Sequence, residues 1–238
     1  MTTYVVRHGQ TNYSKRYLVN GDPAKHVHLN QEGRQSLGHA WATLPLHTVA
    51  TWLTSEFPRA RQTTSLLMGV PAARLVVDAR LNELDYGEFE GHPFLEYAVW
   101  LDTHGARQRP AGSAESQHEC IRRMLSGMLA VLDHPGPRVL VGHGLLVSLL
   151  LWHRDRSPVE RMPLFFPEAP YVDPVAITDD DLPGMVAALL RDLDSAGHHE
   201  SAADGDAGIL RISGGSSVAT VVSVSPSRSP DKKDLPHA

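Results

Sequence analysis

An arginine and a histidine stand directly after the first apolar run of the chain. Tyr4–Val6 is typical of a buried strand, and Arg7 and His8 follow at its carboxyl end, where open α/β sheets bind their ligands. An imidazole can attack phosphorus, and a guanidinium offers a planar fork of donors to phosphate oxygens. Gly9 lets the backbone come close to a ligand. The pair indicates phosphoryl transfer, although a histidine at this place is also a common structural residue, so the interpretation depends on partners elsewhere.

Three later stretches supply such partners. Each places a charged or titratable group beside a predicted strand end or turn: Arg59 and Arg61 in residues 59–63, Glu83 in residues 81–91, and His143 in residues 139–144. The two arginines lie two positions apart on a predicted helix and therefore face different sides. Only one of them can reach the same site as His8.

The four stretches together resemble the histidine phosphatase superfamily, which has the phosphoglycerate mutase-like fold. The resemblance is carried, in order, by an RHG after the first strand, an RA-x-QT, an L-x-E-x-x-x-G-x-x-EG and a late HG, over roughly residues 2–153. It implies an α/β fold: a three-layer α/β/α sandwich with a mostly parallel central sheet. It also selects Arg59 over Arg61 as the second phosphate ligand, and it assigns Glu83 as the proton donor to the leaving oxygen.

The resemblance further implies which residues bind the phosphorylated substrate. This set is Arg7, Gly9, Gln10, Thr11, Ser14, Gly21, Arg59, His143 and Gly144. Two positions depart from the superfamily pattern. Ser14 stands where many relatives have Asn, and Ser148 stands where they often have Arg, so auxiliary phosphate contacts are expected to be weaker.

These residues predict a metal-independent phosphomonoesterase that works through a phosphohistidine on His8. A phosphate monoester carries roughly two negative charges, and Arg7, Arg59 and His143 supply two to three positive ones. His8 must attack from its neutral form, so its second ring nitrogen should donate to an acceptor such as a backbone carbonyl. Glu83 needs a raised pKa to protonate the alkoxide, and it then activates the water that splits the intermediate.

Two alternatives remain open at this stage. The first is a 2,3-bisphosphoglycerate-dependent phosphoglycerate mutase. In such mutases the general-acid motif continues with an arginine that grips the substrate carboxylate, whereas Glu83 is followed here by Leu84 and Asp85, which favours hydrolysis. The second is an inactive relative that binds phosphorylated ligands. It would be expected to have lost one of the core arginines or histidines, and all of them are present.

Composition excludes several other classes of function. A formal charge of −5 and a pI near 6.3 argue against a nucleic-acid partner. The single cysteine, Cys120, excludes an internal disulfide, and no basic and apolar leader precedes the first strand, so we expect a cytoplasmic protein. The most apolar stretch, residues 139–152, is too short to span a membrane. The expected partner is a small-molecule phosphomonoester, and a homodimer is compatible with the sequence.

The 14 histidines do not indicate a metal site. The sequence contains no HExxH, no CxxC and no paired set of His–carboxylate motifs at one-turn helical spacing, and His26, His28 and the pair His198-His199 are typical of solvated loops. We therefore expect neither a metal nor a cofactor.

The remaining pattern predicts one domain and a tail. Helices are expected near residues 29–44, 59–68, 93–104, 113–133, 145–152 and 179–194, and strands near 49–55, 75–77 and 138–142. Five prolines between residues 158 and 174 indicate an irregular segment, and the helix at 179–194 is expected at the surface. The predicted organisation is a domain over 1–195, a linker and terminal hairpin over 196–225, and a disordered tail over 226–238.

Overall fold

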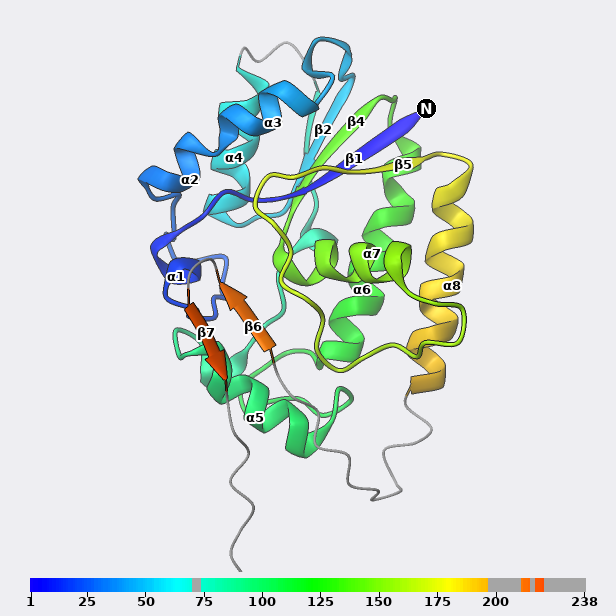
Figure 1. The fold of residues 1–238 in the computed structure, drawn as a ribbon. Coiled ribbons are helices and arrows are strands. Elements are labelled where there is room, and N and C mark those ends of the chain that lie inside the picture. Colours follow the sequence, from blue (N-terminus) through cyan, green and yellow to red (C-terminus); the bar gives the residue numbers. More distant parts are fainter. Residues whose placement is uncertain (70–73, 197–210, 215–216, 221–238) are drawn as a thin grey trace, which may run out of the picture. The chain divides into compact units, whose positions relative to one another are not determined.

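The computed structural model describes residues 1–69, 74–196, 211–214 and 217–220. The chain divides into two compact units, residues 1–202 and 203–238. The first unit contains a five-stranded sheet with the strand order β3-β2-β4-β1-β5 (Figure 1). Its strands are β1 (Thr2–Arg7), β2 (Thr51–Thr54), β3 (Arg74–Val77), β4 (Arg138–Gly142) and β5 (Val175–Thr178).

The first four strands are parallel, so their carboxyl ends share one edge of the sheet. Arg7 of β1 pairs with Gly142 of β4, and Thr54 of β2 pairs with Val141. The His8 amide continues the ladder by donating to the Gly142 carbonyl over 3.0 Å. This register carries the residues that follow β1, β2 and β4 to the same place, as the sequence predicted.

Alternate residues of the central strands enter two separate cores. Val5, Leu53 and Leu140 belong to one cluster, whereas their neighbours Val6 and Val141 belong to the other. A strand buried on both faces needs apolar residues at consecutive positions, which explains the continuous apolar runs of β1 and β4. The sheet is therefore the middle layer of the predicted α/β/α sandwich.

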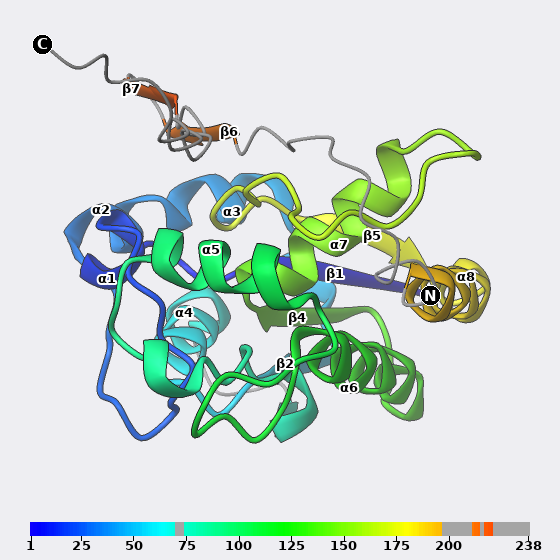
Figure 2. The same cartoon turned by 90° about the horizontal axis from the view of Figure 1, so that it is seen from below.

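Helices cover both faces of this sheet. The cluster that contains Val6 and Val141 packs against α3 (Leu37–Thr43) and α4 (Pro58–Met68). The cluster that contains Val5, Leu53 and Leu140 packs against α6 (Gln117–Ala130), α7 (Gly144–Asp155) and α8 (Asp181–Ala196). Figures 1 and 2 both show α3 and α4 on the opposite side of the strands from α6 and α8. Further helices complete the described part of the unit: α1 (Asn12–Lys15), α2 (Gln31–Gln35) and α5 (Phe94–His104). Single 3-10 turns lie at Leu46–Thr48, Ala79–Leu81, Gly87–Phe89 and Val131–Asp133.

The sequence-based prediction was wrong in the segment before α8. β5 lies at the end of the stretch that was predicted to be irregular, and it pairs antiparallel with β1. Val175 and Ile177 are buried while Ala176 and Thr178 are exposed, so burial alternates with the period of two expected for a strand. The strand has only four residues, and so short an alternation is a weak signal in the sequence. Pro174 precedes the strand, a position that proline tolerates. The predicted surface helix α8 also buries a full apolar stripe: Leu182, Val186, Leu189 and Leu193.

The second unit contains β6 (Arg211–Gly214) and β7 (Ser217–Thr220), which pair antiparallel. Gly214 is opposite Ser217. The terminal hairpin within residues 196–225 stays a prediction. The predicted linker before it and the predicted tail lie outside the described residues. Among the helices that the structure describes, none combines the length and apolarity needed to cross a bilayer.

We expect Leu140→Ala to destabilise the protein by about 2–5 kcal/mol, because Leu140 is completely buried in the central strand β4 and its loss leaves a cavity. Urea unfolding measures the change. Val159→Ala is the control, since Val159 is 90% exposed, and its effect should stay within about 0.5 kcal/mol. A loss below about 1 kcal/mol for Leu140→Ala would contradict the described packing.

Candidate active site

His8 presents one ring nitrogen as a free base at the end of β1. Its Nδ1 lies 2.8 Å from the Gly9 carbonyl oxygen, which can only accept a hydrogen bond, so Nδ1 carries the proton. The lone pair of Nε2 accepts from Arg59 Nε over 3.0 Å. This arrangement is the predicted tautomer, in which Nε2 carries no proton and keeps its lone pair.

The surroundings also keep His8 neutral. The side chain is buried, and this desolvation, together with the nearby charges of Arg59 and Arg7, lowers its pKa well below the usual value. A neutral imidazole at neutral pH can attack an electrophile without first losing a proton.

Arg59 connects the two histidines. It lies in the first turn of α4, is 4% exposed, and donates to His8 Nε2, to the Asn20 carbonyl oxygen over 3.0 Å and to His143 Nδ1 over 3.2 Å. Another of its nitrogens donates to Asn20 Oδ1, and its guanidinium lies over the Phe57 ring. Burial lowers its pKa to about 10, so it stays charged at neutral pH. Arg61, the competing candidate, is exposed.

His143 forms the N-cap of α7 and is completely buried. Because its Nδ1 accepts from Arg59, its Nε2 carries the proton and donates to Ser55 Oγ over 2.7 Å. Burial and the neighbouring arginines lower its pKa well below the usual value, so it is neutral. The positive charge of the site therefore comes from Arg7 and Arg59, the lower end of the predicted two to three charges.

Arg7 is held by a segment far away in the sequence. Its Nη1 donates to the Ala169 carbonyl over 2.6 Å and forms an ion pair with Glu168 over 3.1 Å. Its Nη2 donates to the Tyr171 hydroxyl over 3.2 Å. Arg7 Nε is buried and has no hydrogen-bond partner in the described part of the chain. A Cβ on Gly144 would lie 3.5 Å from this nitrogen, so Arg7 Nε faces the start of α7.

Glu83 has the electrostatics of a proton donor. Burial raises its pKa above the usual value, against the opposing effects of the Arg59 charge and of a hydrogen bond from the Leu84 amide over 3.0 Å. The neighbouring acids hold the loop by accepting from backbone amides. Asp85 accepts from the amides of Gly87 and Ala114, and Glu90 accepts from the Gly21 amide.

The other predicted substrate-binding residues divide into two groups. Gly9 and Gly21 sit where the backbone comes close to neighbours, and a Cβ at Gly21 would lie 2.1 Å from the Leu84 carbonyl oxygen. A Cβ at Gly144 would make only ordinary contacts, with the Arg7 side chain. The Gly9 amide donates to Thr63 Oγ1 over 3.1 Å.

The second group has local structural partners. Thr11 and Ser14 form the capping box of α1, and the Gln10 side chain accepts from Asn30, the N-cap of α2. The structure assigns these three side chains to local structure, so their predicted contact with substrate stays a prediction.

Several contacts of the site were not found by sequence reasoning: Asn20, Ser55, Thr63, Glu168 and Tyr171. Thr63 could have been found, because it follows Arg59 by one helical turn and donates to its carbonyl. The others lie on loops and at a strand end, and nothing in their local sequence marks them.

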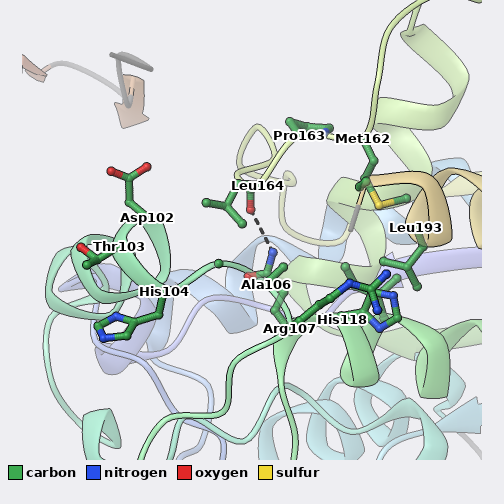
Figure 3. A pocket seen from close by; sticks show the side chains of 14 residues that line it. Asp102, Thr103, His104, Ala106, Arg107, His118, Met162, Pro163, Leu164 and Leu193 are labelled. Atoms are coloured by element: carbon green, nitrogen blue, oxygen red, sulfur yellow. Dashed lines mark hydrogen bonds between the residues drawn. The ribbon is translucent and has the colours of Figure 1, made fainter. Parts of the chain in front are cut away.

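No group of three or more potential metal ligands occurs among the described side chains. A separate cavity of about 430 Å³ lies between the α5–α6 connection, α8 and residues 162–164. Figure 3 shows Arg107 and His118 on one side of it and Met162 and Leu164 on another. None of the predicted site residues lines this cavity.

Comparisons with known proteins agree with this geometry. The sequence model of the histidine phosphatase superfamily (branch 1) matches residues 3–175. The chain belongs to this superfamily. It is 28% identical over 161 residues to a probable phosphoglycerate mutase, GpmB, of Klebsiella pneumoniae, covering 63% of this chain and 73% of the relative.

Solved structures of other histidine phosphatases share the fold. A putative α-ribazole-5′-phosphate phosphatase from Escherichia coli superposes with a TM-score of 0.59 at 19% identity, covering 74% of this chain and 89% of the other. A mycobacterial glucosyl-3-phosphoglycerate phosphatase gives a TM-score of 0.50 at 24% identity, covering 63% of this chain and 80% of the other.

We expect Glu83→Gln to raise the melting temperature at neutral pH but not in acid. In the unfolded chain this carboxyl has a pKa near 4.5, and in the folded protein its pKa is higher. Stability is therefore lost as pH rises through the folded pKa, and the uncharged variant avoids this loss. Thermal unfolding of both proteins between about pH 4 and pH 8 measures the difference. A difference that does not grow with pH contradicts the raised pKa.

Proposed function

We propose that this histidine phosphatase is a metal-independent phosphomonoesterase that hydrolyses a small phosphorylated metabolite through a phosphohistidine on His8. The observation that carries the proposal is the neutral His8 ring, with the Nε2 lone pair directed at a buried, charged guanidinium. That is the arrangement of a nucleophile at an anion site. The proposed place of action is the cytoplasm.

The reaction balances with these groups alone. His8 Nε2 forms a bond to phosphorus while the P–O bond to the leaving alkoxide breaks, and the alkoxide takes the proton of Glu83. A water molecule then gives a proton to the Glu83 carboxylate, and its oxygen attacks phosphorus as the P–N bond breaks. His8 returns to its neutral form and Glu83 to its acid form.

Positive charge around His8 suits the transferred phosphoryl group. Arg59 already donates to the nucleophilic nitrogen, so in the complex the phosphoryl oxygens would take over that N–H. The unpartnered Arg7 Nε supplies a second donor. The N-terminus of α7, whose N-cap His143 makes no side-chain cap bond, adds a favourable dipole end.

Hydrolysis is favoured over mutase activity by the two residues after Glu83. Leu84 is 2% exposed, and the Asp85 carboxylate accepts from two backbone amides, so neither can grip a substrate carboxylate. Assays with 3-phosphoglycerate, with and without 2,3-bisphosphoglycerate, separate the two activities. Interconversion to 2-phosphoglycerate much faster than phosphate release would establish the mutase instead.

We expect His8→Ala to abolish turnover and phosphoenzyme formation while the protein stays folded. The native protein, quenched rapidly after mixing with radiolabelled substrate, should carry an acid-labile, base-stable label. His47→Ala is the control, because His47 is an exposed histidine in the turn after α3, and it should leave both signals unchanged. Residual activity of His8→Ala within tenfold of native, or no trapped label, would argue for direct attack by water. Binding without turnover on a broad phosphate-ester panel would identify the inactive alternative.

We expect Glu83→Gln and Arg59→Ala to differ in their dependence on the leaving group. A general acid acts only on the leaving oxygen, so Glu83→Gln should slow alkyl phosphates by roughly 10²- to 10⁴-fold and para-nitrophenyl phosphate far less. A residue that binds the transferred phosphoryl group stabilises its charge whichever group leaves, so Arg59→Ala should slow the hydrolysis of both substrates by a similar factor. Single-turnover measurements isolate the phosphorylation step. Equal slowing of both substrates by Glu83→Gln would refute the acid assignment, and Asp85 would be tested next.

A further inference from the structure

The loop between α7 and β5 returns to the carboxyl end of β1 (Figure 1). Its residues 168–172, here called the 168–172 segment, contact Arg7 on both its side chain and its backbone. The Val172 amide donates to the Arg7 carbonyl over 3.0 Å, while Glu168, the Ala169 carbonyl and Tyr171 hold the guanidinium. The segment is therefore built around this one arginine.

The partners of the Arg7 guanidinium in the described part of the chain lie in the 168–172 segment. Both terminal nitrogens are directed to the 168–172 segment, and the Tyr171 ring lies under the guanidinium with its centroid 4.0 Å from Cζ. Only Nε, which is buried and faces the start of α7, lacks a partner among the described residues. The contacts fix which edge of the guanidinium points toward the site.

The segment is firmly anchored and locally strained. Ala169 and Val172 are 2% and 1% exposed, and the Gln117 side chain donates to the Leu164 carbonyl just before them (Figure 3). Val172 has a φ of 50°, a left-handed conformation that a β-branched residue rarely adopts. Such strain persists only where the surroundings impose it, and it is concentrated at functional sites. Here it accompanies the turn that brings Tyr171 onto Arg7.

We propose that Glu168 and Tyr171 are positioning residues of the active site, which hold Arg7 so that its Nε–H is presented to the substrate phosphate. The proposal rests on the proposed function and extends it to a segment outside the four sequence motifs. An arginine that is already oriented loses little rotamer freedom when phosphate binds, and its donor is aimed before the reaction begins. Tyr171 also borders the nucleophile, because its ring centroid lies 6.4 Å from that of His8.

The test compares variants that remove one contact each. Glu168→Ala removes the ion pair, Glu168→Gln keeps an acceptor oxygen, and Tyr171→Phe keeps the ring but loses the hydroxyl. Glu160→Ala is the matched control, because Glu160 lies in the same loop but accepts from Trp152 instead of Arg7. Each variant is measured for kcat, KM, melting temperature and the binding of inorganic phosphate by calorimetry. The same set is repeated in an Arg7→Ala background.

We expect Glu168→Ala to weaken phosphate binding and to lower kcat/KM by roughly 10- to 100-fold, equally for alkyl and para-nitrophenyl phosphates. Glu168→Gln and Tyr171→Phe should lose less, and Glu160→Ala should stay within about twofold. In the Arg7→Ala background the Glu168 substitution should lower kcat/KM and phosphate binding almost no further, because the effects of residues that act through one group are not additive. A merely structural role would lower the melting temperature without this dependence on Arg7.

The outcomes separate this proposal from the proposed function. Two results would overturn the positioning role without affecting the proposed hydrolase function. One is native-like kinetics and phosphate binding in Glu168→Ala and Tyr171→Phe. The other is losses of kcat/KM in these variants that add fully to the loss caused by Arg7→Ala. A native protein that binds phosphate but hydrolyses no ester would overturn the hydrolase. Weaker phosphate binding in Glu168→Ala would then still support the positioning role. A native protein that binds no phosphate would overturn both.

Discussion

The site depends on one buried cation, the guanidinium of Arg59. It donates to a ring nitrogen of each histidine and to the loop at Asn20, so it joins the ends of β1 and β4 and the α1–α2 connection to the start of α4. These contacts fix the tautomers of both rings, because each ring nitrogen that faces Arg59 must accept. Removing this buried charge would leave the acceptors on His8, Asn20 and His143 without their donor. Arg59 therefore stabilises the structure of the site in addition to its predicted role in binding phosphate.

Burial and the charges of the arginines together shift the pKa values of His8, His143 and Glu83. The arginine charges and burial lower the pKa of His8 and His143, which keeps both rings neutral. The same charges oppose the rise in the Glu83 pKa, but burial has the larger effect. The site thus combines the charged Arg59 guanidinium, two neutral rings and a carboxyl whose pKa is raised. Burial thus lowers the pKa of the predicted nucleophile, His8, and raises the pKa of the predicted acid, Glu83.

Sequence reasoning predicted the elements whose signal is local. The apolar runs of β1 and β4, the capped helices and the motif residues at the ends of parallel strands follow from periodicity and from the resemblance to the superfamily. It missed β5, which shows its period over only four residues beside a proline. It also missed Asn20, Ser55 and Glu168, whose partners lie between 39 and 161 residues away in the chain. Contacts of this kind come from tertiary packing, and no local pattern encodes them.

Arg7 is positioned in a different way from the other motif residues of the site. His8, Arg59 and His143 are placed by the register of the sheet, which the fold itself determines. Arg7 stands in the same register, yet its terminal nitrogens are directed by Glu168 and Tyr171, in a loop whose backbone is strained at Val172. The register of the sheet therefore brings the predicted site residues together, whereas the orientation of the Arg7 guanidinium depends on Glu168, which is 161 residues away in the chain.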